Sequence, residues 1–453
     1  MLMSLKNKIL NLLKIDHERT LNIKKNIVYS FLIRGLSSLT GFLLVPLTIH
    51  YLNTVQYGIW LTIASLVAWI NTFDIGLSNG LRNKLAESFA LNKKENIAKY
   101  ISTTYALLFI IALAIFIIFF SIGTFFNWDQ LLRMPSSVGY SIRPIILIAT
   151  GFFCIQFVLQ PINSILIATQ QPFKSSLILL AGQFITLIAT YVLIKSTSSN
   201  LLILVIAVSG APIFALLLAS LYFFITSFKS FIPKLKFIDF KSAKNLLSLS
   251  TAFFFVQIGA LVLYETDNII ITRTLGPSEV TTFNIAYKYF SILTIAFNII
   301  ITPYWSAYTD AYAKNDFAWI KHSIKKLRIF WVYFSIAALV LYFFSGVFYK
   351  FWVGDKIAVP GTLSLSVAIY VMVQNWYVLH NYLLNGTGKL RVQLILITSM
   401  GIVNILLSVL LINYIGIAGT VIANIIVMAI MTAFLTYQSK LVMNRTATGI
   451  WNK

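Results

Sequence analysis

Charged side chains within long apolar stretches are the residues of this sequence that could do chemistry. The candidates are Arg34, Asp74, Glu265, Asp267 and Lys288. A charge near the centre of a bilayer costs about 3 kcal/mol, so it usually marks either a packing partner or a transport path. These residues therefore predict transport chemistry, in which fixed charges meet a charged substrate or a coupling ion.

The first two candidates lie near one face of the membrane. Arg34 lies about eight residues, or roughly 12 Å, inside its apolar stretch. Its guanidinium is a rigid fork of donors that fits phosphate oxygens and stays charged in any surroundings. We expect Arg34 to contact an anionic substrate that enters from this face. Asp74 lies about 9 Å from the same face. It is a candidate partner of Arg34, and such a pair would serve packing equally well.

The other three candidates lie near the opposite face. Glu265, Asp267 and Lys288 all fall about 10 Å inside it. We expect Lys288 to pair with one acid and to leave the other acid in excess. A carboxyl group in a membrane path can exchange a proton or bind Na⁺, so coupling to an H⁺ or Na⁺ gradient is a hypothesis for these acids.

The chain that positions these groups is far more apolar than a soluble protein. Of its 453 residues, 58% are hydrophobic and 11% are charged, and the mean hydropathy is +0.84. About twelve stretches are long enough to cross a hydrocarbon core of roughly 30 Å as helices. Their expected bounds are 26–51, 55–80, 100–125, 142–169, 175–195, 200–226, 246–272, 282–307, 327–349, 362–384, 391–413 and 416–438. The sequence thus predicts an all-α polytopic membrane protein.

The distribution of basic residues predicts the orientation. Most of the 35 Lys and Arg residues fall in connections on the same side as the N-terminus. Because short cytoplasmic loops retain cations, we expect both termini to be cytoplasmic. The same rule accounts for the net charge of +22 without a nucleic-acid partner.

Enzyme chemistry finds little support in the sequence. The connections run to about twenty residues at most, which leaves no room for a soluble catalytic domain. The four histidines lack metal-binding spacing, the single cysteine, Cys154, lies in an apolar stretch, and no phosphate-binding loop sequence is present. We expect no catalytic residue, no cofactor and no metal.

A weak internal repeat predicts two halves. YLNTVQYGIW, at 51–60, aligns with TLGPSEVTTF, at 274–283, when Leu52 is placed on Leu275. Chance similarity between apolar segments is the alternative. Six helices in each half is the simplest interpretation. We expect a cytoplasmic amphipathic segment (1–25), a first lobe (26–226), a cytoplasmic linker (227–245), a second lobe (246–438) and a cytoplasmic tail (439–453). The repeat places Gln257 opposite Arg34, so the cation is not duplicated.

The second apolar stretch ends in FDIGLSNGLRNKLAE, at 73–87. The run 83–99 predicts an interfacial amphipathic helix that turns Leu85 and Phe89 toward lipid. Together with TLGPSEVTTFNIAY (274–287), LLNGTGKLR (383–391) and VNILLSVLLINYIGIAGTVIAN (403–424), this motif resembles polysaccharide transport proteins. These belong to the multidrug/oligosaccharidyl-lipid/polysaccharide (MOP) exporter superfamily. The resemblance is to Wzx-type flippases of O-antigen or capsule repeat units and covers about 26 to 438.

The resemblance implies a bacterial inner-membrane protein with two six-helix lobes, MATE-like, around a cavity that opens alternately to each side. Such proteins move undecaprenyl-diphosphate-linked oligosaccharides to the outer leaflet. It implies cavity cations that meet the diphosphate or acidic sugars. Arg34 is the residue it supports best, Lys288 is a second candidate, and Arg273 is a third, at the outer rim. Membrane lipids and the polymerase and chain-length machinery of the pathway are the implied partners.

Two other members of the superfamily are alternatives. An H⁺- or Na⁺-coupled multidrug antiporter would share the architecture and would use Asp74, Glu265 or Asp267 for ion coupling. A lipid II flippase would usually bring two further helices at the C-terminus. The motifs above favour the polysaccharide transporters over both.

Overall fold

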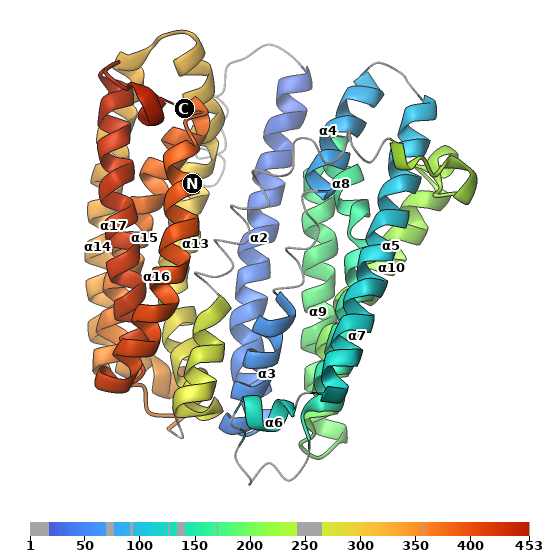
Figure 1. Cartoon of the computed structure of the whole chain (residues 1–453), viewed down its shortest axis with the longest axis vertical. Helices are drawn as coiled ribbons and strands as arrows, with labels where there is room; N and C mark the ends of the chain where they lie inside the picture. Colours follow the sequence, from blue (N-terminus) through green and yellow to red (C-terminus); the bar gives the residue numbers. More distant parts are fainter. Residues whose placement is uncertain are drawn as a thin grey trace, which may run out of the picture.

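The structure is a computed structural model in which every described element is helical (Figure 1). It describes residues 18–68, 77–90, 94–125, 127–132, 134, 141–169, 171–241, 265–355 and 357–452. Within these ranges, 9 helices are long and apolar enough to cross a membrane, and the stretches Gly35–Tyr51 and Thr54–Val67 are shorter apolar helices. The predicted all-α membrane fold is confirmed.

The first half of the chain forms the first lobe. Its helices are α2 (Glu18–Tyr51), α3 (Thr54–Ala68), α4 (Leu77–Ala90), α5 (Lys94–Phe125), α6 (Trp128–Leu131), α7 (Arg143–Leu159), α8 (Pro161–Ala168), α9 (Pro172–Ser196) and α10 (Leu201–Ile225). α7 and α8 share one predicted stretch, and the break falls at Pro161, whose missing N–H and ring disfavour a continuous helix. Asn200 caps α10, because its side chain accepts a hydrogen bond from the backbone N–H of Ile203 at 3.2 Å.

The second half follows a linker with two short 3-10 turns, η3 (Lys229–Phe231) and η4 (Leu235–Phe237). Residues 265–275 are helical. The remaining elements are α13 (Pro277–Ala313), α14 (Phe317–Val353), α15 (Gly361–Thr387), α16 (Arg391–Ile415), α17 (Ala418–Met443) and the 3-10 turn η5 (Gly449–Asn452). With 37 residues each, α13 and α14 are about 55 Å long and extend well beyond the hydrocarbon core.

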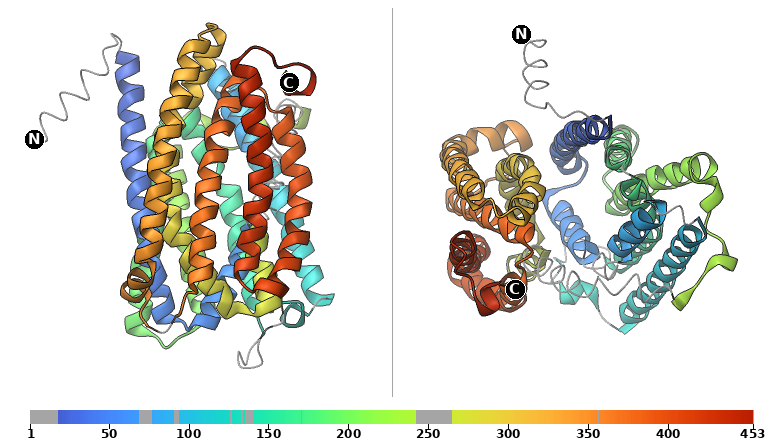
Figure 2. Two further views of the ribbon diagram at one scale, coloured as in Figure 1. Left: turned by 90° about the vertical axis from the view of Figure 1, so that its left-hand side faces the viewer. Right: turned by 90° about the horizontal axis from the view of Figure 1, so that it is seen from above.

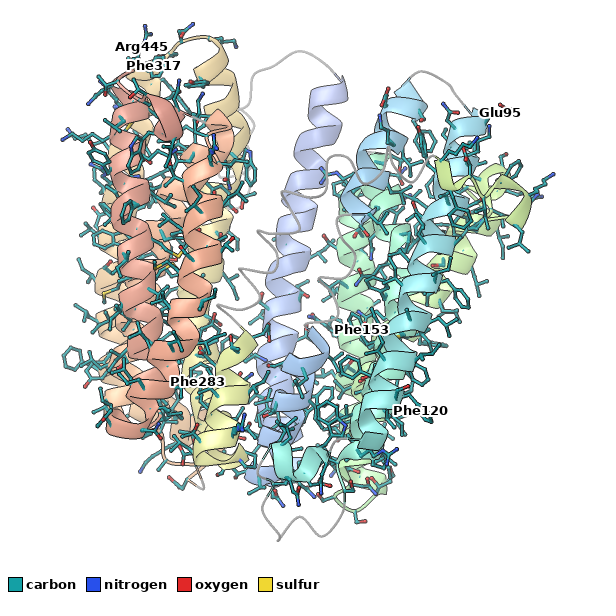
Figure 3. The ribbon with its side chains drawn as sticks, viewed as in Figure 1. Glu95, Phe120, Phe153, Phe283, Phe317 and Arg445 are labelled. Atoms are coloured by element: carbon teal, nitrogen blue, oxygen red, sulfur yellow. The ribbon has the colours of Figure 1, made fainter. Side chains whose placement is uncertain are left out.

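The helices form two lobes, seen from one end in Figure 2, that converge at one end and diverge at the other (Figure 1). We call these the narrow end and the wide end. α3 and the start of α13 meet at the narrow end (Figure 1). Arg445 and Phe317 lie at the wide end of the second lobe and Glu95 at the wide end of the first (Figure 3).

Apolar side chains cover much of the outer surface, as expected for contact with lipid. On α2, a stripe of exposed leucines recurs at helical spacing at Leu32, Leu36, Leu39 and Leu43. On α14, Phe351 is 88% exposed. Each lobe also has an apolar interior, and that of the second lobe extends to Val45 of α2. The fold thus buries one set of hydrophobic side chains and presents another to the bilayer.

The predicted interfacial helix at 83–99 is wrong. α4 runs to Ala90 and α5 begins at Lys94, so two helices share this segment. Leu85 is fully buried in the first lobe, and the ring of Phe89 packs 5.8 Å from that of Phe231. The amphipathic pattern arises because α4 turns its apolar face to α5 and α8, not to lipid.

Candidate functional site

At the narrow end the two lobes are joined by a close approach at a glycine and by threonine hydroxyl groups. Gly58 of α3 lies so close to α13 that an added Cβ would be 1.6 Å from the carbonyl oxygen of Pro277. The hydroxyl of Thr281 donates a hydrogen bond to the carbonyl oxygen of Thr54 at 2.8 Å. Thr62 and Thr272 also share a hydrogen bond between their buried hydroxyls. Only glycine fits at position 58 while this junction is closed.

This junction has the symmetry of the internal repeat. Placing Leu52 on Leu275 maps Thr54 to Pro277 and Gly58 to Thr281. The contact between Gly58 and Pro277 and the contact between Thr54 and Thr281 therefore exchange with each other. Such an exchange is the mark of a two-fold-related interface. The turns that the sequence alignment paired thus meet in space.

Lys288 carries a positive charge to the boundary between the lobes. An added Cβ at Gly41 of α2 would lie 3.8 Å from Nζ of Lys288, so the ammonium group approaches α2 from α13. Among the residues that the structure describes, this ammonium group has no hydrogen bond and no ion pair. The ion pairs found there join Lys84 to Glu87 and Lys350 to Asp355. An ammonium group in this position can attract an anionic group that enters between the lobes.

A second polar site lies within the second lobe, close to the junction. It is a cavity of about 150 Å³ lined by Glu265, Asp267, Asn268, Phe283, Asn284, Tyr287, Tyr370 and Asn424. Asp267 is 3% exposed, and its Oδ1 has no hydrogen-bond partner among the described residues. Hard cations such as Na⁺ prefer oxygen ligands, and this cavity offers carboxylate, amide and phenol oxygens. It can therefore hold a small cation or a proton.

Hydrogen bonds between amides fix the walls of this cavity. Nδ2 of Asn424 donates to Oδ2 of Asp267 at 2.6 Å, and Nδ2 of Asn404 donates to Oδ1 of Asn424 at 2.6 Å. On the other side, Nδ2 of Asn284 donates to Oδ1 of Asn268 at 2.8 Å. Nδ2 of Asn268 in turn donates to the hydroxyl of Ser65, on α3, at 2.8 Å. The cavity is therefore linked to α16 and α17 and, across the junction, to the first lobe.

The predicted ion pair between Lys288 and an acid is wrong. All three groups are described, yet neither Glu265 nor Asp267 forms a salt bridge with Lys288. Asp267 is turned into the second lobe toward α17, whereas Lys288 is turned toward α2. Similar depth in the membrane did not bring them together, because the two groups point in different directions.

The structure places the other predicted residues as follows. Arg34 precedes Gly41 by seven positions on α2, so its backbone lies on the same helix face, about 10 Å nearer the wide end. The side chain of Arg34 and the whole of Asp74 lie outside the described residues, so their pairing stays a prediction. Arg273 is exposed near the end of the helical residues 265–275, beside the narrow-end junction.

Aromatic and hydroxyl groups lie along α13 toward the wide end. Thr302 follows Lys288 by 14 positions, close to four helical turns, so both lie on the same side of α13 about 21 Å apart. Thr302 and Tyr382 bring their hydroxyl oxygens within 3.5 Å. The Trp305 ring, on a residue that is 44% exposed, meets the Tyr382 ring edge-on at 5.5 Å.

Several of these residues escaped the sequence prediction. Asn404 and Asn424 stand within apolar stretches, and a buried amide there is a signal like that of a buried charge. Gly58 and Thr281 lie in the aligned repeat segments, but the alignment does not show that these segments touch. Trp305 and Tyr382 had no signal that separates them from the many aromatic residues facing lipid.

Known proteins share this fold. A multidrug resistance MATE family transporter of the MOP superfamily, in an inward-facing conformation, matches with a TM-score of 0.75 at 12% identity, covering 91% of this chain and 96% of that one. The outward-facing conformation of such a transporter matches with a TM-score of 0.60 at 14% identity, covering 94% and 96%. The fold is thus MATE-like, as predicted.

Similar sequences are found among membrane proteins and O-antigen transporters. A putative O-antigen transporter of Salmonella typhi is 19% identical over 371 residues, which is 79% of this chain and 82% of that protein. The uncharacterized membrane protein EpsK of Bacillus subtilis is 21% identical over 418 residues, covering 90% and 82%. The family model described as polysaccharide biosynthesis protein matches residues 23–309. The chain therefore belongs to the polysaccharide biosynthesis protein family, as its motifs predicted.

Proposed function

We propose that this transporter moves undecaprenyl-diphosphate-linked oligosaccharide repeat units from the cytoplasmic to the outer leaflet of the bacterial inner membrane. The observation that carries the proposal is the ammonium group of Lys288, which approaches α2 at the boundary between the lobes without an acidic partner among the described residues. The diphosphate of such a substrate is an anion that would pair with this ammonium group. The O-antigen transporters among its relatives support the same substrate class.

The wide end is the cytoplasmic end in this proposal. Its described cations include Lys321, Lys325 and Lys326 at the start of α14 and Arg445 beyond α17. Short cytoplasmic loops retain such cations. The closed narrow end then faces outward, and the arrangement corresponds to an inward-facing state. The higher TM-score with the inward-facing transporter supports this orientation.

The substrate would follow the exposed side of α13. Trp305 and Tyr382 offer aromatic surfaces near the wide end, and aromatic rings pack against the apolar faces of sugar rings while hydroxyl groups bind their edges. Lys288, farther in, would attract the diphosphate. The lipid tail would stay in the bilayer. Once on the outer leaflet, the repeat unit would be available to the polymerase and chain-length machinery of the pathway.

The carboxylate cavity would couple this cycle to an ion gradient. Binding of Na⁺ or H⁺ at Glu265 and Asp267 would change the hydrogen bonds that run from Asn268 to Ser65 across the junction. The same cavity, on a MATE-like fold, favours the second candidate function, an ion-coupled multidrug antiporter. The anionic or cationic nature of the transported molecule separates the two functions.

Deletion and complementation in the native host test the proposal. The assay measures which leaflet holds the undecaprenyl-diphosphate oligosaccharide in cells that carry no gene, the wild-type gene, or genes for Lys288→Gln or Arg34→Gln. Lys321→Gln, an exposed cation on α14, is the matched control.

We expect the deletion to trap the oligosaccharide on the cytoplasmic leaflet, with rescue by wild type and Lys321→Gln and weak rescue by the other two variants at normal membrane abundance. Rescue by Lys288→Gln at the wild-type level would show that this cation does not contact the substrate. Unchanged surface glycan, with altered sensitivity to cationic drugs, would favour the antiporter instead.

A further inference from the structure

The first lobe carries an apolar groove on its outer face that no step of the proposed transport uses. One part of it, about 370 Å³, lies between α5 and the inter-lobe linker and is lined by Tyr105, Phe109, Leu235 and Phe240 among others. A second part, about 460 Å³, lies between α5 and α7, lined by Phe109, Leu113, Phe116 and Ile155 among others. Phe109 borders both parts, so they are adjacent along α5.

The linker is fixed to α5 at the point where that helix becomes apolar. The backbone N–H of Lys234 donates to the hydroxyl of Ser102 at 3.1 Å, and the backbone N–H of Asp239 donates to that of Thr103 at 2.9 Å. From Ala106 onward the sequence of α5 is apolar for more than ten residues. The linker is therefore fixed beside the point where the apolar run of α5 begins.

The linker has the composition of a segment that enters the lipid headgroup region. Leu235 is 87% exposed and Phe240 is 57% exposed, and both line the groove. Lysines surround them, and the exposed ones are Lys229, Lys234, Lys236 and Lys241. Exposed apolar side chains among lysines favour an anionic lipid surface.

We propose that this groove binds one anionic glycerophospholipid of the cytoplasmic leaflet, with its phosphate at Lys234 and Lys236 and an acyl chain along α5. The proposal rests on the orientation given above, in which the wide end is cytoplasmic. The groove descends from Tyr105 to Phe116, eleven residues or about 16 Å, which is half of a hydrocarbon core of roughly 30 Å. That depth fits one leaflet and is too short for a polyprenyl tail to lie extended.

Such a lipid would fasten the start of the linker to the first lobe. The linker joins α10 to the second lobe, so the point at which it is anchored sets the position from which the second lobe can move. Lipid binding would then stabilise the first lobe without taking part in substrate contact. It is also measurable without transport, so failure of the flippase proposal leaves this test intact.

Native mass spectrometry of the purified full chain tests the proposal, with phosphatidylglycerol or phosphatidylcholine added in increasing amounts. A lysine near an anionic headgroup contributes roughly fivefold in affinity. We expect Lys234→Gln with Lys236→Gln to weaken the binding of one phosphatidylglycerol by roughly 25-fold. The control pair Lys321→Gln with Lys325→Gln, on exposed cations of α14, should leave that site unchanged.

A second variant tests the chain-binding part of the groove. Ile155 is 51% exposed, so Ile155→Trp fills the groove without disturbing the interior, and Ile188→Trp on α9, 60% exposed, is its control. We expect only Ile155→Trp to lose the bound lipid, and glycerol 3-phosphate alone not to compete for it. Equal binding of the two lipids by wild type, or loss of the lipid in the control variants, would overturn the proposal.

Discussion

Replacing Gly58 by alanine tests whether the narrow end must open during transport. An added Cβ would lie 1.6 Å from the carbonyl oxygen of Pro277, whereas real Cβ atoms do not approach within 3.0 Å. α3 and α13 must therefore separate by about 1.4 Å. Alanine favours helix by up to about 1 kcal/mol over glycine, so the helix itself does not suffer. The substitution acts on the contact between the lobes alone.

The size of the effect follows from the hydrogen bonds that this separation breaks. These are Thr281 to Thr54, Thr62 to Thr272, and Asn268 to Ser65. Each contributes about 1 kcal/mol net, so the closed narrow end loses about 3 kcal/mol relative to the open one. At 1.4 kcal/mol per factor of ten, the ratio of the two states shifts by roughly a hundredfold toward the open narrow end.

Electron–electron distance measurements between spin labels report this shift. The labels are attached at Asn53→Cys and Leu275→Cys, two exposed positions on opposite sides of the junction, in a Cys154→Ser background. We expect Gly58→Ala to move most of the distance distribution to longer values and to stop transport. Gly210→Ala, whose Cβ would meet Phe152 at an ordinary 3.6 Å, is the control and should change neither. An unchanged distance distribution in Gly58→Ala would refute the proposal that this junction closes the narrow end toward the outside.

Three further predictions concern the path and the cavity. Lys288→Arg should retain most of the flipping rate while Lys288→Gln loses at least tenfold in a leaflet-accessibility assay; equal rates would remove the cation from the path. Asp267→Asn should abolish the dependence of transport on the H⁺ or Na⁺ gradient while the protein still folds, since the amide oxygen of the new side chain can take the place of Oδ2 and accept from Asn424; retained ion dependence would contradict the coupling role. Trp305→Ala should weaken sugar-dependent transport about fivefold and Trp305→Phe only slightly, as one stacking contact contributes about 1 kcal/mol; equal loss in both would argue for a packing role.

The fold was predictable because hydrophobic length alone determines how many helices cross a bilayer. The spans predicted at 200–226 and 391–413 differ from α10 and α16 by at most two residues at each end. Prediction failed where helices run beyond the hydrocarbon, as in α13 and α14, since polar helical turns outside the membrane resemble loops in a hydropathy profile. The run after Gly80 failed for a related reason, because an apolar face buried in protein and one facing lipid have the same pattern.

The site was predictable only in part. The charges at Glu265, Asp267 and Lys288 stood out because each is costly in an apolar stretch. The directions in which these side chains point could not be predicted. An ion pair forms only when two helix faces meet, and depth in the membrane gives only one of three coordinates. The junction at Gly58 and Pro277 depends on the approach of two backbones, which leaves no signal in polarity.

The part of α13 between Thr281 and Thr302 contains neither glycine nor proline, so it would move as one rigid piece. Thr281 lies at the junction, so α13 would rotate about this point, and Thr302 lies about 31 Å away from it. A rotation of about 15°, the size seen in other rigid-body transitions, would swing Thr302 through roughly 8 Å. A displacement of barely more than an ångström among four threonines and a glycine would thus accompany a movement about as wide as a sugar ring at the wide end.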